Sequence, residues 1–115
     1  MTVQDLIKKE VFKVINVGEN LDKVISKPFC CDLLSIAMGK APADSAWVTV
    51  MGNINTLAVA ALTDIACIVL AEGAVLDIPA LDKAKNQKIT VLATDKPIFD
   101  ASLMVYEMLH AAPVL

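Results

Sequence analysis

Apolar residues recur in three short runs that show no polar alternation. The runs cover residues 47–50, 66–70 and 89–93, and each leads into a turn signal and then a helical pattern. Strands of this kind are buried on both faces of a parallel sheet. Parallel strands also need crossovers, which are usually helices. The pattern predicts a β-α-β-α-β core, with any binding site where its strands end.

The N-terminal segment predicts shorter elements around this core. Thr2 and Asp5 have the spacing of a capping box, so we expect a short helix that ends near residue 10. Residues 11–17 alternate between apolar and polar positions, which predicts a strand with one wetter face. Residues 24–31 contain a proline, so they form an edge strand or an irregular piece.

Four further helices are expected along the chain. Asp32 should cap a helix over residues 33–38, and Gly39 should end it. The helix over residues 54–63 is apolar nearly all round, so it is buried or lies at an interface. A third helix starts after Asp77 and continues to residue 86, and the terminal helix follows residues 95–97.

These elements indicate one α/β domain over residues 1–115. The length is that of a single domain, and no linker, low-complexity tract or internal repeat divides it. We expect three layers, with a mostly parallel sheet of four to five strands and helices on both faces.

The composition of the chain predicts a protein partner. Hydrophobic residues make up 57% of the chain and aromatic residues only 4%, so some aliphatic surface should lie near the outside. Exposed apolar surface in a small domain most often marks an interaction site. We expect a homodimer, joined through the helix of residues 54–63 and the terminal helix.

Charge and cysteine content exclude several classes. All ten basic residues are lysines and the net charge is −3, so nucleic-acid binding is not expected. The odd cysteine count argues against a disulfide framework, and residues 1–10 are too polar for a signal peptide. The uncharged window 45–63 has turn chemistry at its middle rather than a membrane span. We expect a soluble, cytoplasmic protein without membrane contact.

The main candidate site is the turn formed by Gly52, Asn53, Asn55 and Thr56. It lies between a strand and a helix N-terminus, where free backbone N–H groups can bind a ligand. Alternatively, Gly52 only makes the turn and an asparagine only caps the helix.

Two further pairs of residues follow the neighbouring strands. Glu72 and Gly73 end one strand and would face the same crevice, unless they are a solvated glutamate and a turn glycine. Thr94 and Asp95 end the next, and they either join the crevice or cap the terminal helix. Because Glu72 would repel a phosphate chain, we expect a neutral or weakly charged ligand, or a protein backbone.

The remaining reactive residues favour structural roles. Cys30 and Cys31 are adjacent rather than spaced as metal ligands, so we expect both to be buried apolar residues. His110 suits the end of the terminal helix, and Trp47 suits the core. The sequence predicts no metal, no cofactor and no catalytic residue.

Several short motifs resemble known families. The opening of the chain resembles the N-terminal domain of HPr kinase/phosphorylases at residues 2–6 (TVQDL), 14–18 (VINVG) and 18–22 (GENLD). The rest resembles the DRTGG domain at residues 32–35 (DLLS), 52–53 (GN), 66–73 (ACIVLAEG) and 91–95 (VLATD). This resemblance implies a shared α/β fold and a regulatory or ligand-sensing role.

The chain departs from the DRTGG pattern at two places. It has Gly52-Asn53-Ile54 where the family tends to have Gly-Asp-Arg, and Ala71-Glu72-Gly73 where the family has Thr-Gly-Gly. The phosphate-binding loop of the kinases is also missing. We expect a stand-alone, non-enzymatic domain. The alternatives are an accessory subunit of a larger complex and a minimal phosphotransfer or hydrolytic enzyme using Asp32, Glu72 or Asp95.

Overall fold

The computed structural model describes residues 1–111 and contains one five-stranded sheet with the order β1-β5-β4-β3-β2. Strands β3 (Ala46–Thr49), β4 (Cys67–Leu70) and β5 (Val91–Ala93) are parallel neighbours, as predicted. At one edge β2 (Pro28–Cys30) pairs in parallel with β3, and at the other β1 (Lys13–Asn16) pairs antiparallel with β5. The predicted α/β class and the mostly parallel sheet are confirmed.

The central strands have apolar side chains on both faces. In β4, Cys67 and Val69 belong to one hydrophobic cluster, whereas Ile68 and Leu70 belong to the other. This division follows from the pleat, which turns successive side chains to opposite faces. Trp47 of β3 is fully buried, as predicted. Each face of the sheet therefore needs a helical layer.

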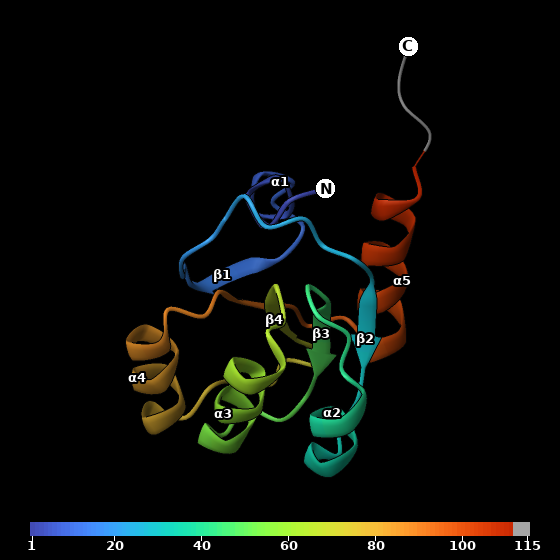
Figure 1. Ribbon diagram of the computed structural model, residues 1–115. Helices are drawn as coiled ribbons and strands as arrows, with labels where there is room; N and C mark the ends of the chain where they lie inside the picture. The colour runs from blue at the N-terminus through green and yellow to red at the C-terminus, as the bar shows by residue number, and fades with distance from the viewer. Residues whose placement is uncertain (112–115) are drawn as a thin grey trace.

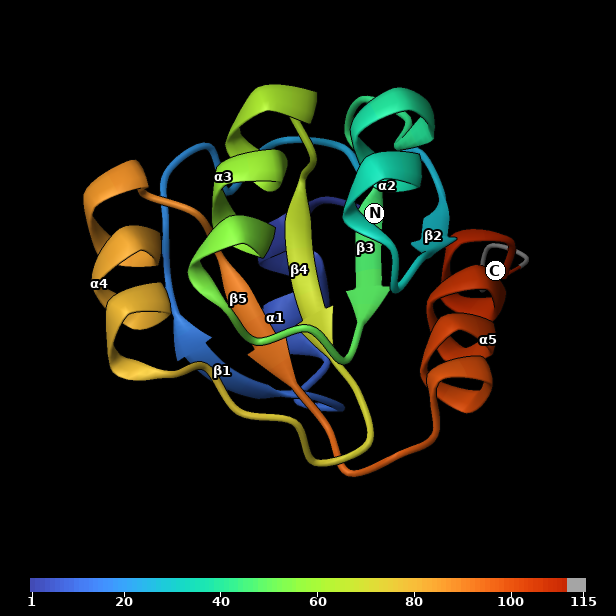
Figure 2. The ribbon, with the colours of Figure 1, turned by 90° about the horizontal axis from the view of Figure 1, so that it is seen from below.

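Helices cover both faces of the sheet (Figures 1 and 2). One face carries α2 (Leu34–Lys40), α3 (Ile54–Thr63) and α4 (Ile78–Gln87). The other carries α1 (Val3–Lys8) and α5 (Ile98–Leu109), and α5 lies next to the edge strand β2. The three-layer prediction is thus confirmed.

Side-chain caps fix the starts of α1 and α4. The capping box at α1 is confirmed, because Asp5 N–H donates to Thr2 Oγ1 and Thr2 N–H donates to Asp5 Oδ2. Asp77 caps α4 by accepting from the N–H of Ala80 at 2.8 Å. The bounds of α3 agree with the predicted residues 54–63.

The predicted start and end of α2 are wrong. Asp32 does not cap this helix, because its Oδ1 accepts from Thr49 Oγ1 at 2.7 Å and from Val50 N–H at 2.9 Å. These groups stand at the end of the neighbouring strand β3, where the buried Thr49 hydroxyl needs an acceptor. Gly39 lies inside the helix rather than after it.

The burial predicted for Cys30 and Cys31 is also wrong. Cys30 is exposed and Cys31 is half-buried, because they belong to or follow an edge strand that has no further strand beside it. Cys30 Sγ lies 2.7 Å from Ser102 Oγ on α5, whereas Cys31 packs against the cluster under α2. The two side chains therefore point to opposite faces, as their adjacency predicts.

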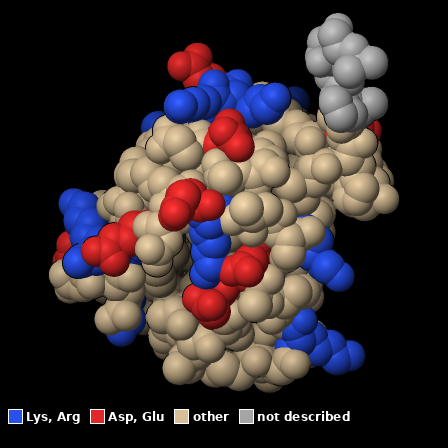
Figure 3. Space-filling model, turned by 45° about the horizontal axis from the view of Figure 1, so that its top comes forward, with Lys and Arg blue, Asp and Glu red and all other residues tan. Residues whose placement is uncertain are grey.

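Most charged side chains on the face seen in Figure 3 lie in mixed groups of both signs, and the remaining basic ones stand apart from one another. Lys23 Nζ, for example, is 3.2 Å from Asp44 and 2.8 Å from Asp64. This face thus has no extended basic area of the kind that follows a nucleic-acid backbone. Within residues 1–111, no helix combines the length and the apolar character needed to cross a bilayer.

Substitutions at a crowded glycine and at an uncrowded one test this packing. A Cβ on Gly18 would lie 2.1 Å from the carbonyl oxygen of Lys88, so Gly18→Ala should lower the free energy of unfolding by about 2 kcal/mol. Gly39 has open space around its Cα, so Gly39→Ala should raise it by about 0.5–1 kcal/mol. Urea unfolding followed by Trp47 fluorescence measures both. Equal stability of the two variants would contradict the packing.

Candidate functional site

The candidate site lies at the carboxyl ends of β4 and β5, where the connections diverge. The chain leaves β4 toward α4 on one face, but it leaves β5 toward α5 on the other (Figure 2). Parallel sheets open a crevice at a position of this kind, because the two loops separate above and below the strand ends. The strand ends of β2 and β3 lack this divergence, since α2 and α3 share a face.

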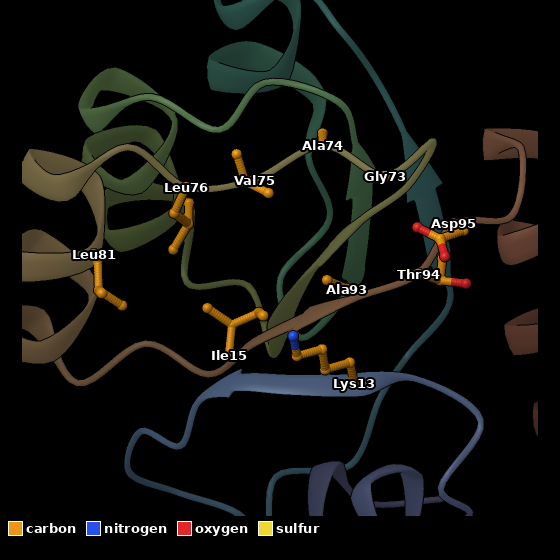
Figure 4. A pocket seen from close by; sticks show the side chains of 10 residues that line it. All are labelled: Lys13, Ile15, Gly73, Ala74, Val75, Leu76, Leu81, Ala93, Thr94 and Asp95. Atoms are coloured by element: carbon orange, nitrogen blue, oxygen red, sulfur yellow. The ribbon is translucent and has the colours of Figure 1, made fainter.

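A pocket of about 320 Å³ occupies this position (Figure 4). We call it the edge pocket, since it also reaches the edge strand β1. Its volume is at the small end of the range for ligand sites, roughly 300–1,000 Å³. Its lining residues are Lys13, Ile15, Gly73, Ala74, Val75, Leu76, Leu81, Ala93, Thr94 and Asp95.

The edge pocket is apolar at one end and polar at the other. Figure 4 shows Ile15, Leu76 and Leu81 at one end and Asp95 beside Gly73 at the other, with Lys13 between them. Neither the Lys13 ammonium nor the Asp95 carboxylate forms an ion pair within residues 1–111. The pocket therefore offers one cation and one anion whose charges are not neutralised by partners in the protein.

The polar end is held by hydrogen bonds between the two diverging loops. Glu72 N–H donates to the Lys96 carbonyl at 2.8 Å, and Gly73 N–H donates to the Thr94 carbonyl at 3.0 Å. Both Glu72 and Gly73 have positive φ, at 60° and 72°. Gly73 adopts this conformation without penalty, whereas Glu72 is held in it by these contacts.

Glu72 has a structural role that the sequence did not reveal. Its Oε2 accepts from the N–H of Ile98 at 2.9 Å and so caps α5 from another loop. Glu72 stays exposed, so the alternative of a solvated glutamate holds alongside this cap, whereas the predicted Thr94–Asp95 cap of the terminal helix is wrong. Asp95 makes no such bond, and the N-cap position of α5 is Pro97, which has no acceptor side chain.

The Gly52 turn does not leave room for a ligand. A Cβ on Gly52 would lie 2.0 Å from the carbonyl oxygen of Val75, and Asp77 N–H donates to the Gly52 carbonyl at 3.1 Å. The loop after β4 thus crosses directly over this turn. The expectation of open space around Gly52 is wrong, because that loop covers the carboxyl end of β3.

Asn53 caps α3. Its Oδ1 accepts from the N–H groups of Asn55 at 3.0 Å and Thr56 at 3.1 Å. The cap satisfies these two N–H groups, whereas those of Asn53 and Ile54 have no protein acceptor within residues 1–111, so the N–H groups of this turn are only partly free. Among the predicted residues, the edge pocket includes Gly73, Thr94 and Asp95, with Glu72 adjoining it in sequence. Gly52, Asn53, Asn55 and Thr56 lie outside its lining.

The sequence reasoning missed the far side of the edge pocket. Lys13 and Ile15 come from β1, which reaches the pocket only because β1 pairs with β5. Leu76 and Leu81 come from the connection into α4 and from α4 itself. The apolar and polar alternation of β1 was visible, but its neighbour in the sheet was not.

The other reactive groups are arranged for packing. Burial raises the pKa of the Cys67 thiol to about 12, so this thiol stays protonated and unreactive at neutral pH. The His110 ring stacks on Tyr106, with ring centroids 4.1 Å apart, and its Nδ1 lies 2.8 Å from the Tyr106 carbonyl. Within residues 1–111, no three His, Cys, Asp or Glu side chains gather as metal ligands.

The fold is similar to that of a solved regulatory region. This region consists of the CBS and DRTGG domains of the Clostridium perfringens pyrophosphatase, complexed with the activator diadenosine tetraphosphate. The TM-score is 0.69 at 14% sequence identity, over 90% of this chain and 44% of that chain. No family model matches the sequence. The comparison with curated proteins finds no match either. The chain therefore has a distant DRTGG-like fold and spans less than half of the structure it matches.

Substitutions at Glu72 can distinguish the stability contributed by its cap on α5 from the cost of its positive φ. Glu72→Ala should lower the free energy of unfolding by about 1 kcal/mol, because the Ile98 N–H loses its acceptor. Glu72→Gly loses the same acceptor but relieves the positive φ, so it should be less destabilising. Urea unfolding of both variants, with Glu72→Gln as the control that keeps an acceptor oxygen, provides the comparison. A Glu72→Ala variant as stable as the wild type would show that the cap contributes nothing.

Proposed function

We propose that this chain is a non-enzymatic, ligand-sensing regulatory domain that binds a small molecule in the edge pocket. The observation that carries the proposal is the pocket itself, at the divergence of two loops, with an apolar end and two unpaired charges. Pockets of this make-up are the usual small-molecule sites of α/β folds. The regulatory nature of the similar pyrophosphatase region supports the same role here.

The activator of that region is a polyphosphate, but a different ligand suits this chain. The chain contains no arginine to grip phosphates, and Asp95 places a carboxylate in the pocket. Glu72 adds a second carboxylate nearby, on the loop whose N–H bonds hold the pocket's polar end. A neutral or weakly charged ligand avoids the repulsion that a phosphate chain would meet.

Catalysis is the weaker alternative. Of the three carboxylates considered for an enzyme, Asp32 is bonded to Thr49 and Val50, and Glu72 caps α5. Only Asp95 faces the edge pocket, and no histidine or cysteine lines the pocket beside it. A general acid or base needs a partner to position it, so this arrangement favours binding over turnover.

We further propose that the chain forms a homodimer through α5. Phe99, Leu103 and Tyr106 are 71%, 40% and 51% exposed and follow one another at helical spacing. We call these three residues the α5 stripe. The predicted contribution of α3 is smaller, because α2 and α4 flank it and leave mainly its two ends, Ile54 and Leu62, exposed.

The alternative partner for the α5 stripe is a different protein, for which this chain would be an accessory subunit. An apolar helix face suits either partner, and neither requires nucleic acid or a membrane. The three cysteines are free thiols, which suits a reducing compartment such as the cytoplasm.

Ligand binding can be tested with amide NMR and a mixture of small metabolites. Compounds that bind should shift the amide signals of residues 73–76 and 93–95. Ala93→Leu, which adds carbon atoms to the pocket lining, should abolish these shifts. Ala61→Leu makes the same change on the exposed face of α3 and should leave them intact. Shifts confined to α5, or no shifts from any compound, would contradict ligand sensing in the edge pocket.

The dimer can be tested by sedimentation at micromolar concentration. Leu103→Glu places a charge in the α5 stripe and should yield a monomer, because the carboxylate would be desolvated in the interface. Leu62→Glu on α3 is the matched control, since this leucine is 72% exposed and lies outside the α5 stripe. A wild-type monomer, or a Leu103→Glu variant that stays dimeric, would contradict pairing through α5.

A further inference from the structure

We propose that the edge pocket selects a zwitterionic α-amino acid with an aliphatic side chain. This inference rests on the proposed function, because it names the class of ligand for the same pocket. Three features of the lining carry it, namely an apolar end, an unpaired ammonium and an unpaired carboxylate.

The apolar end specifies the side chain of the ligand. Ile15, Leu76 and Leu81 come from three different elements and meet at this end (Figure 4). They contribute only hydrocarbon surface, so the group placed among them must be apolar. Burying such a group is favourable by about 0.8 kcal/mol for each CH₂ removed from water. The volume of about 320 Å³ is sufficient for a short branched chain.

The two charges specify the head group. Lys13 runs along β1 with its ammonium toward Ile15, and Asp95 marks the polar end (Figure 4). A ligand carboxylate at Lys13 and a ligand ammonium at Asp95 would satisfy both groups at once. An α-amino acid bears these two charges on one carbon, next to its side chain.

The backbone around the pocket supports this head group. Within residues 1–111, the N–H groups of Val75 and Leu76 have no protein acceptor and can serve a ligand oxygen. The N–H groups of Gly73 and Ala74 are used by the Thr94 and Ala71 carbonyls, which holds the loop in place. A pre-formed loop binds a ligand without first losing its own freedom.

Charge selection can be tested by matching isosteric variants with modified ligands. In NMR titrations that follow the amide signals of the ¹⁵N-labelled protein, we expect L-leucine to bind about fivefold more tightly than either L-leucinamide or N-acetyl-L-leucine. Lys13→Met should weaken L-leucine about fivefold while leaving L-leucinamide unchanged. Asp95→Asn should weaken L-leucine about fivefold while leaving N-acetyl-L-leucine unchanged. Lys85→Met and Asp82→Asn, on α4 and outside the pocket lining, are the controls and should bind as the wild type does.

The outcomes separate the class of ligand from the proposed function. If L-leucine binds but the two pocket variants bind it as tightly as the wild type, charge selection is wrong. If L-leucinamide binds as tightly as L-leucine, the pocket takes a peptide N-terminus, and the amino-acid class is wrong. If L-leucine produces no shifts while another metabolite shifts residues 73–76, the class is wrong but ligand sensing stands. If no compound shifts these residues, both proposals are wrong.

Discussion

Strand β4 has no polar side chain, and both of its faces lie in the hydrophobic core. A strand of this kind can exist in water only between two layers that exclude it, so helices must cover the sheet above and below. Three successive crossovers place α2, α3 and α4 on one face. The last helix must then help α1 to cover the other face, and so the chain changes face after β5. The edge pocket is a consequence of this change.

The elements with local signals could be predicted from the sequence. The three parallel strands were visible as apolar runs, and α3 and α4 as helical patterns that follow turn residues. The capping box of α1 was also visible, because Thr2 and Asp5 lie within one helical turn of each other. In each case the residues that determine the structure are neighbours in the chain, so their spacing alone carries the information.

The candidate site depends on contacts between distant residues. Gly52 was assigned to a ligand turn, but the Val75 carbonyl fills the space beside it. Asp32 was assigned to a helix cap, but it satisfies Thr49 on the neighbouring strand. Glu72 caps a helix that begins 26 residues later. No periodicity or local spacing encodes these partners, because they become neighbours only once the sheet has formed.

The pairing of β1 with β5 has a consequence for how the protein is made. Lys13 faces Ala93 across these strands, so residues from near the two ends of the chain must meet before the sheet is complete. A ribosome releases the N-terminal part first, and that part has no strand partner until β5 emerges. The walls of the edge pocket are thus complete only once β1 has paired with β5 and the loop after β4 is in place. A molecule held in the edge pocket would therefore recognise only a domain whose sheet has formed, and its binding would stabilise that fold by mass action.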